Sequence, residues 1–227
     1  MVNIRHIRKS NLAFKLSDHV SSLVAVFVGA TSGIGLGTLK QYAKYAQGGK
    51  AYIIGRSKSA AQPLLDELKE SNPTGTFEFI ETEISLIKNV DLACDQIKTK
   101  EKKVDILFMS PGFLAWGGRI GLFWDLSYTY NTNNDLESAE GIDVPHALRY
   151  YSRLRFVYNL LPLLTESPSP RVISILAGGK ESAIDINDLE VHNDFTFAKA
   201  AANGTTQTTL AFEELAKSYP SITFIHK

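Results

Sequence analysis

Short apolar runs rich in valine and isoleucine alternate with longer amphipathic segments along the chain. Most of the short runs are apolar at nearly every position, which is typical of parallel strands covered on both faces. The pattern predicts strands at 23–29, 51–55, 77–81, 104–110, 171–176 and 221–226. It predicts helices at about 34–47, 59–71, 86–100, 143–166 and 195–218. Repeated strand–helix units of this kind indicate an α/β fold with a parallel sheet and right-handed crossovers.

The chain has 227 residues, the size of one domain, and no internal repeat or low-complexity segment divides it. Residues 1–22 form a basic lead-in, which we expect to be amphipathic and to pack beside the first strand. A targeting sequence is the alternative, but Lys15 and Asp18 interrupt its only apolar stretch. We therefore expect a single domain, residues 1–227, with a long loop at 111–141.

Two irregular regions follow the carboxyl ends of predicted strands, where open α/β sheets bind ligands. Residues 111–141 are rich in glycine, asparagine and aromatic residues, and residues 177–194 carry two adjacent glycines and a cluster of acidic groups. A long loop inside a compact domain is more often functional than idle. We expect these regions to border a ligand site, with a surface insertion as the alternative.

Composition narrows the classes of partner. Lysine and arginine number 24, as do aspartate and glutamate, so the formal net charge is zero, and no long basic run favours nucleic acid. No segment approaches the roughly 18 consecutive apolar residues of a membrane span. The single cysteine, Cys94, excludes an internal disulfide and suits a reducing compartment. These features favour a cytoplasmic protein without nucleic-acid or membrane partners.

The stretch "VFVGATSGIGLG" joins the first predicted strand to the first predicted helix. Gly29, Gly33 and Gly35 have the spacing G-x3-G-x-G, a relative of the dinucleotide-binding fingerprint. Gly29 would permit a tight turn, Gly33 a close approach of backbone to pyrophosphate, and Gly35 close packing of helix on strand. The helix N-terminus would offer N–H groups and a favourable dipole to the negative charge.

The second predicted strand ends in "IIGRS". A site for NAD usually has a carboxylate here, which binds the ribose 2′-OH. This chain has Arg56 in that neighbourhood, followed by Ser57. A guanidinium with a hydroxyl beside it suits the 2′-phosphate of NADP. NADP is therefore favoured over NAD, and a solvated surface arginine is the alternative.

Together these residues resemble the short-chain dehydrogenase/reductase family from about residue 22 to the end. "GATSGIG" matches the family's cofactor loop, and "LLPLL" (160–164) matches the end of its long central helix. The sequence, including the stretch "YYSRLRF", is most similar in character to divergent fungal members of the family, often from secondary-metabolite pathways. The resemblance implies a Rossmann-type, doubly wound parallel sheet with helices on both faces. It assigns a cofactor loop of Gly29, Thr31, Ser32, Gly33, Ile34 and Gly35.

The resemblance implies further cofactor contacts after the third and fourth strands. In "ETEIS", Glu83 would approach the adenine amino group and Ile84 would pack on the ring. In "VDILFMSPG", Met109, Ser110 and Pro111 replace the first three positions of the family's Asn-Asn-Ala-Gly turn, and Gly112 keeps the fourth.

The catalytic positions match the family poorly. The family couples a tyrosine acid–base to a lysine four residues later, assisted by a serine and an asparagine. Lys199 keeps its place and would also hold the nicotinamide ribose, but the tyrosine position is Phe195, which has no proton to give. The serine position falls near Ala177 or Gly178, and the asparagine position near Arg149. Three of the four groups are missing, so activity is uncertain.

Other residues are candidates for a substitute proton donor, without an assignment. They are His192, Tyr150, Tyr151, Glu181, Asp185 and Asp188. The simpler interpretations are a surface histidine, tyrosines that pack in the core, and solvated or capping carboxylates. No His/Cys cluster has the spacing of metal ligands, so we expect no metal.

The chain stops at Lys227, where the family continues into substrate-binding helices and a last strand. We expect that C-terminal substrate-binding portion to be lacking, or the natural chain to be longer. Three functions stay open: an NADP-dependent oxidoreductase acting on a small organic carbonyl, alcohol or imine, a non-redox cyclase or isomerase, and a silent binding or interaction protein. A homodimer through the helices at 143–166 and 195–218 is an expectation by fold analogy.

Overall fold

The structure is a computed structural model that describes residues 3–15, 22–112, 138–193 and 195–227. Within these residues the strands are β1 (Val24–Val28), β2 (Lys50–Gly55), β3 (Thr76–Glu81), β4 (Ile106–Met109), β5 (Arg171–Ser174) and β6 (Thr223–His226). The helices are α1 (Ile4–Lys15), α2 (Gly33–Tyr45), α3 (Lys58–Ser71), α4 (Ile87–Lys100), α5 (Val144–His146), α6 (Ser152–Thr165) and α7 (Phe197–Ser218). A π-helical segment, η2 (Ala147–Tyr151), joins α5 to α6.

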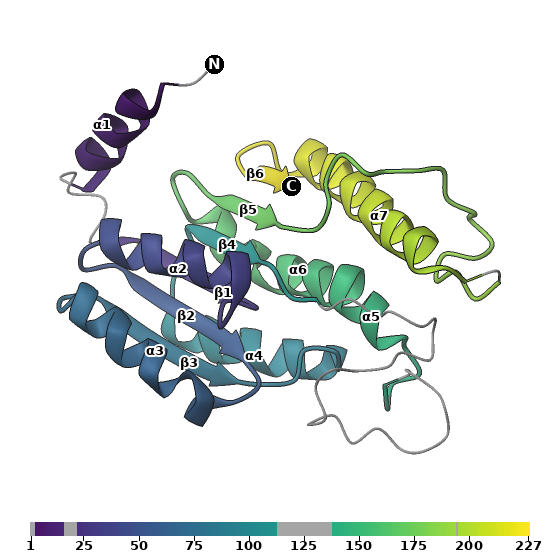
Figure 1. Cartoon of the computed structure of the whole chain (residues 1–227), viewed down its shortest axis with the longest axis horizontal. Helices are drawn as coiled ribbons and strands as arrows, with labels where there is room; N and C mark the ends of the chain where they lie inside the picture. Colours follow the sequence, from purple (N-terminus) through teal and green to yellow (C-terminus); the bar gives the residue numbers. More distant parts are fainter. Residues whose placement is uncertain (1–2, 16–21, 113–137, 194) are drawn as a thin grey trace.

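These strands form one parallel sheet in the order β3-β2-β1-β4-β5-β6 (Figure 1). That order defines the doubly wound Rossmann sheet. Every residue of β1 is buried, because this strand is central in the sheet and covered on both faces. The predicted fold class is confirmed.

Different helices cover the two faces of the sheet. Val24, Val26 and Val28 of β1 belong to a hydrophobic cluster with residues of α4, α6 and α7. Ala25 and Phe27 point to the other face, where they pack with residues of α2 and α3. Successive side chains of a strand alternate between faces, so the continuous apolar run of β1 supplies both cores.

The carboxyl ends of β1 and β4 form the point where the strand order reverses. β1 pairs with β2 on one side and with β4 on the other. The glycine-rich loop follows β1, and the turn at 110–112 follows β4, so the two meet at this edge of the sheet. Open α/β sheets bind their ligands at such a switch point.

The helices differ from the expectation in local detail. Residues 4–10 of α1 are exposed, and α1 contacts α2. The helix expected at 143–166 contains the wider turns of η2. α7 begins two residues later than expected, because Thr196 caps it by accepting the backbone N–H of Lys199 at 3.1 Å. Most of the loop at 111–141, with its aromatic residues, lies outside the described residues.

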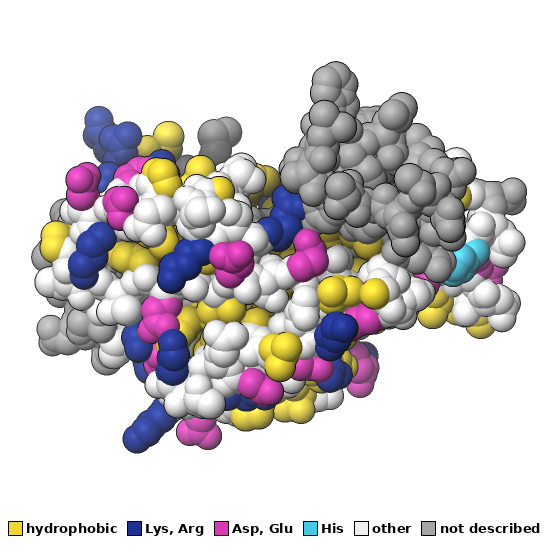
Figure 2. Space-filling model, turned by 90° about the horizontal axis from the view of Figure 1, so that it is seen from below, with side chains coloured by type: hydrophobic (Ala, Val, Ile, Leu, Met, Phe, Trp, Pro, Cys, Tyr) yellow, Lys and Arg dark blue, Asp and Glu magenta, His cyan; other side chains and the backbone are white. Residues whose placement is uncertain are grey.

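Charged side chains of both signs are interspersed over the face shown in Figure 2, in keeping with the zero net charge. Within the described segments, we find no helix with the length and apolar character that crossing a membrane requires.

Candidate functional site

The glycine-rich loop after β1 packs tightly against the turn after β4. Gly29 has a φ of 74°, and a Cβ there would lie 2.7 Å from the Pro111 backbone. A Cβ on Gly35, in the first turn of α2, would lie 2.5 Å from both the Gly29 carbonyl oxygen and Ser110 Oγ. The Ser110 hydroxyl donates to that same carbonyl at 3.1 Å. Side chains at these two glycines would separate the loop from the turn.

Gly33 has open surroundings instead. Its φ is 57°, and no atom lies within 4 Å of the place where a Cβ would be. Thr31, Ser32 and Ile34 are exposed around it. Ser32 stands at the N-cap of α2 but makes no side-chain cap hydrogen bond, so the first N–H groups of α2 are open to an anion. The open space and the positive end of the helix fit the pyrophosphate of a dinucleotide.

Arg56 is exposed directly after β2. At Gly55, a Cβ would lie 2.8 Å from the ring of Phe79 and 3.3 Å from Cγ2 of Thr31, so packing disfavours a carboxylate side chain there. Ser57 caps α3 through its side-chain oxygen, and its hydroxyl also lies 3.1 Å from the hydroxyl of Ser59, where either group could be the donor.

Glu83 and Ile84 lie in the turn after β3. One carboxylate oxygen of Glu83 accepts the backbone N–H of Ser85 at 3.0 Å. Ile84 is 7% exposed and belongs to the core beside α4, so it offers little surface to an adenine ring. The adenine contacts of both residues stay predictions.

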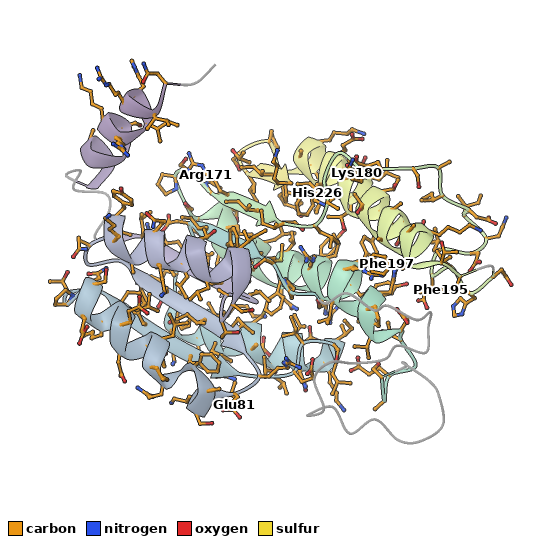
Figure 3. The ribbon with its side chains drawn as sticks, in the orientation of Figure 1. Glu81, Arg171, Lys180, Phe195, Phe197 and His226 are labelled. Atoms are coloured by element: carbon orange, nitrogen blue, oxygen red, sulfur yellow. The ribbon has the colours of Figure 1, made fainter. Side chains whose placement is uncertain are left out.

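Two of the residues expected at the reaction site, Phe195 and Lys199, lie at the amino end of α7, where Figure 3 shows Phe195 and Phe197. Phe195 is half-buried and precedes the helix, while Lys199 is exposed in its first turn. In the loop after β5, Ala177 has a φ of 50°, and a Cβ on Gly178 would lie 2.8 Å from the His226 carbonyl oxygen. Neither residue brings a hydroxyl to the place of the family's serine.

Arg149 occupies the expected asparagine position, in η2. It is 4% exposed, and its guanidinium carbon lies over the ring of Phe197, 5.2 Å from the ring centroid. Its own Cβ is 3.3 Å from the place of a Cβ on Gly204 of α7. The side chain therefore runs between η2 and α7, toward the amino end of α7. Burial lowers the pKa of Arg149, and the carboxylate of Asp143 raises it.

Arg153 holds the carboxyl ends of β4 and β5 together. It is 1% exposed, and burial lowers its pKa to about 9. Its guanidinium has uncharged hydrogen-bond acceptors: the carbonyl oxygens of Leu148, Met109, Pro111 and Ile175, and the hydroxyl of Ser174. Because Pro111 also abuts the glycine-rich loop, this side chain supports the turn on which that loop packs.

Sequence reasoning missed this role of Arg153. A signal was present, because Arg153 has the helical spacing of the fully buried stripe formed by Val157, Leu160 and Leu164. A charged residue in such a stripe needs hydrogen-bond partners, but the sequence does not say which.

The candidate tyrosines are poor replacements for the missing acid. The Tyr151 hydroxyl donates to Glu190 at 2.9 Å, and burial, with that hydrogen bond, raises the pKa of Tyr151 to about 12. Tyr150 packs on the core, and burial raises its pKa too. A phenol with a raised pKa is a weaker acid. His192, another candidate donor, has its Nε2 3.2 Å from Oε2 of the same Glu190.

The candidate carboxylates hydrogen-bond to their own surroundings. Glu181 accepts the hydroxyl of Thr209 at 2.7 Å. Asp185 accepts a backbone N–H at 2.9 Å, and Asp188 accepts two. They serve as caps of the loop after β5. In the part of the chain that the structure describes, no group of three or more His, Cys, Asp or Glu side chains could hold a metal ion.

A family model described as short chain dehydrogenase matches residues 23–217. The chain belongs to the short-chain dehydrogenase/reductase family. The match runs from β1 almost to the end of α7, and it confirms the resemblance inferred from the glycine-rich loop and the central helix.

Several fungal members of the family are similar over the whole chain. Oxidoreductase AN1596 of Emericella nidulans is 43% identical over 226 residues, which cover 100% of this chain and 62% of the relative. The NmrA-like family domain-containing oxidoreductase notO of an Aspergillus species is 37% identical over 230 residues, with 100% and 64% covered. The chain thus spans less than two thirds of the length of these relatives.

Solved structures of the family share the fold. A metagenomic short-chain oxidoreductase in complex with NADP aligns with a TM-score of 0.66 at 14% identity, covering 91% of this chain and 83% of that one. An NADH-dependent reductase complexed with NAD aligns with a TM-score of 0.65 at 20% identity, covering 91% and 78%. Proteins that share this fold are therefore found with either cofactor.

Proposed function

We propose that this chain is an NADP-dependent oxidoreductase with a reduced catalytic site, which acts on a small organic carbonyl, alcohol or imine. The observation that carries the proposal is the loop after β1. Gly29 and Gly35 pack it against the turn after β4, while Gly33 leaves open space at the first N–H groups of α2. A dinucleotide pyrophosphate requires that combination of a fixed backbone and an open cradle.

The preference for NADP over NAD rests on Arg56. A guanidinium binds a phosphate through charge-assisted hydrogen bonds, and Ser57 adds a hydroxyl donor. The packing of Gly55 against Phe79 disfavours the carboxylate that would hold a ribose diol. Glu83 and Ile84 are the proposed adenine contacts, and Ser110, Pro111 and Gly112 form the floor below the cofactor.

The reaction site is expected to be slow on ketones. When bound, NADPH supplies the hydride. Lys199 positions the nicotinamide ribose, but Phe195 has no proton for the substrate oxygen, and such a proton donor contributes roughly 10²–10⁴-fold in rate. Substrates that need no proton at an oxygen, such as iminium ions, lose least. Proximity and orientation still favour the reaction.

Calorimetric titration of NADPH and NADH tests the proposal. We expect NADPH to bind more tightly, and Arg56→Ala to weaken NADPH by about tenfold or more while NADH changes little, because one charge-assisted contact is lost. Lys58→Ala is the matched control, since Lys58 is an exposed cation two residues away. Equal losses for both cofactors, or an equal effect of the control, would remove the 2′-phosphate assignment.

A second function is favoured by Phe195, Ala177 and Arg149, which stand where the family has tyrosine, serine and asparagine. The chain would then bind NADP without redox chemistry, as a cyclase, an isomerase or a silent binding protein. Tight NADPH binding, without NADPH consumption on any member of a ketone and imine panel, would favour this alternative.

We further propose a cytoplasmic location, pairing as a homodimer through α6 and α7, and a place in fungal secondary metabolism. The fungal relatives support the last of these. Size-exclusion chromatography with light scattering tests the dimer.

A further inference from the structure

Arg149 has an unusual environment for a charged side chain. It is 4% exposed, and its guanidinium has a ring contact with Phe197 but forms no hydrogen bond or ion pair with another described residue. A ring contact uses no N–H group, and no Arg149 nitrogen is among the described side-chain atoms that are both fully buried and without a partner, so its donors are available to solvent or to a ligand. Arg153, one turn away, is equally buried but has five acceptors.

The electrostatic surroundings of Arg149 favour an anion. Phe197 is the first residue of α7, a helix of 22 residues, so the guanidinium lies at the positive end of the helix dipole. Lys199 is in the same turn but two positions after Phe197, so its charge lies on a different side of the helix. The carboxylate of Asp143 offsets part of this charge, but it also caps α5 by accepting the His146 N–H at 2.7 Å.

We propose that Arg149 binds a carboxylate of the substrate, at the amino end of α7. The planar guanidinium offers two parallel N–H donors to a carboxylate, and such a bidentate pair is stronger than the ring contact that it would replace. Phe197, whose ring the bound group would displace, is half-buried and not enclosed in the core. The family's asparagine carries no charge and could not serve in this way.

This inference rests on the proposed function for its substrate, but its test does not require turnover. Benzoylformate and its methyl ester are a matched pair that differ by one negative charge. Their affinities are measured by calorimetry in the presence of saturating NADP⁺, which cannot reduce them, and again without cofactor. NADP⁺ binding is measured separately, so a failure of the cofactor assignment is distinguishable from a failure of the carboxylate site.

We expect the wild type to bind benzoylformate about tenfold or more tightly than the ester, as one charge-assisted contact implies. Arg149→Met should abolish this difference, and Arg149→Lys should restore part of it. Arg155→Met removes an exposed cation from the same helix and is the matched control, with no expected effect. Equal affinities for acid and ester in the wild type, including no binding of either, would overturn the proposal.

A second measurement covers the case in which Arg149→Met does not fold. In the wild type, benzoylformate should raise the melting temperature with a saturable concentration dependence, and added chloride should weaken this shift by competition. The ester should give neither effect. A shift of equal size for acid and ester would refute the carboxylate site.

Discussion

The two halves of the sheet have kept the family's pattern to different degrees. In the nucleotide half, from β1 to α4, each glycine of the cofactor loop stands in an environment that suits its expected role. In the proposed reaction half, from β4 to β6, Lys199 is the one residue retained of the four expected for catalysis, and Arg149 and Arg153 are buried charged residues in η2 and α6.

The two halves differ because the cofactor loop depends on backbone geometry, whereas the reaction site depends on side-chain chemistry. The cofactor loop is a backbone structure, in which one added methyl group at Gly29 or Gly35 would meet other backbone atoms below 3 Å. The reaction site is made of side chains on helices, where phenylalanine has nearly the shape of tyrosine. Side-chain chemistry can therefore be exchanged while the fold persists, but the loop geometry cannot.

The largest effects are expected when side chains are added to the glycine-rich loop. Gly35→Ala should cost several kcal/mol of unfolding free energy, because overpacking against backbone forces the loop to move. Gly33→Ala should cost only about 1–2 kcal/mol for its left-handed backbone, yet lower NADPH affinity by about tenfold or more. Urea unfolding and calorimetry measure the two effects.

Gly48→Ala is the control for backbone strain. Gly48 has a φ of 80° and lies in the turn before β2, at the opposite edge of the sheet. It should lose stability as Gly33→Ala does but bind NADPH like the wild type. If Gly33→Ala also keeps its affinity, the pyrophosphate does not lie at Gly33.

The next largest effect is expected at Arg153. Arg153→Met should lower the unfolding free energy by roughly 3 kcal/mol or more, because buried carbonyl groups lose their donors. Arg155→Met is the control: its pair with Asp91 is exposed, and such pairs contribute about 1 kcal/mol or less. Urea unfolding measures the loss of unfolding free energy in both variants. Similar losses would contradict a larger stabilising contribution from the buried contacts of Arg153.

Phe195→Tyr would return a proton donor to the proposed reaction half. We expect carbonyl reduction to rise, but by less than the roughly 10²–10⁴ of a complete acid–base site, because serine and asparagine remain absent. Lys199→Ala should remove the gain. Phe197→Tyr is the matched control, since the same hydroxyl is added two residues away, where the ring faces Arg149. A Phe195→Tyr variant that binds NADPH yet reduces no ketone would favour the non-redox function.

The smallest expected effect is the pH dependence of His226. Burial is the largest influence on its ring and lowers its pKa below the usual value of about 6.5. The unfolded chain then takes up a proton more readily than the folded one, so stability is full above about pH 6.5 and falls as the pH drops through the lower folded pKa. Unfolding at pH 7.5 and pH 5 should show a smaller acid loss for His226→Gln. The same loss in both proteins would contradict this assignment.

The sequence predicted most of the fold, because apolar runs and amphipathic periods are local. β2 was expected at 51–55 and spans Lys50–Gly55, and α4 was expected at 86–100 and spans Ile87–Lys100. The glycine spacing likewise predicted the loop, because tight turns and close approaches depend on single residues. The π-helical turns of η2 were missed, since the apolar period alone does not reveal one extra residue in a turn.

The side-chain contacts of the reaction half could not be predicted in the same way. Arg153 binds Met109 and Pro111, which are 44 and 42 residues away, and Ser174 and Ile175, which are 21 and 22 residues away. These acceptors come together only when β4 and β5 pair. The ring contact of Arg149 likewise depends on how η2 packs on α7.

The hydrogen bonds of Arg153 also have a consequence for the time course of folding. Removing a guanidinium from water is favourable only when its acceptors are in place, and those acceptors come from two strands and a helix that must already be packed. These hydrogen bonds should therefore form after the folding transition state and slow unfolding of the native state. Arg153 would then govern how fast the protein unfolds, while the rate of folding stays nearly the same when it is replaced.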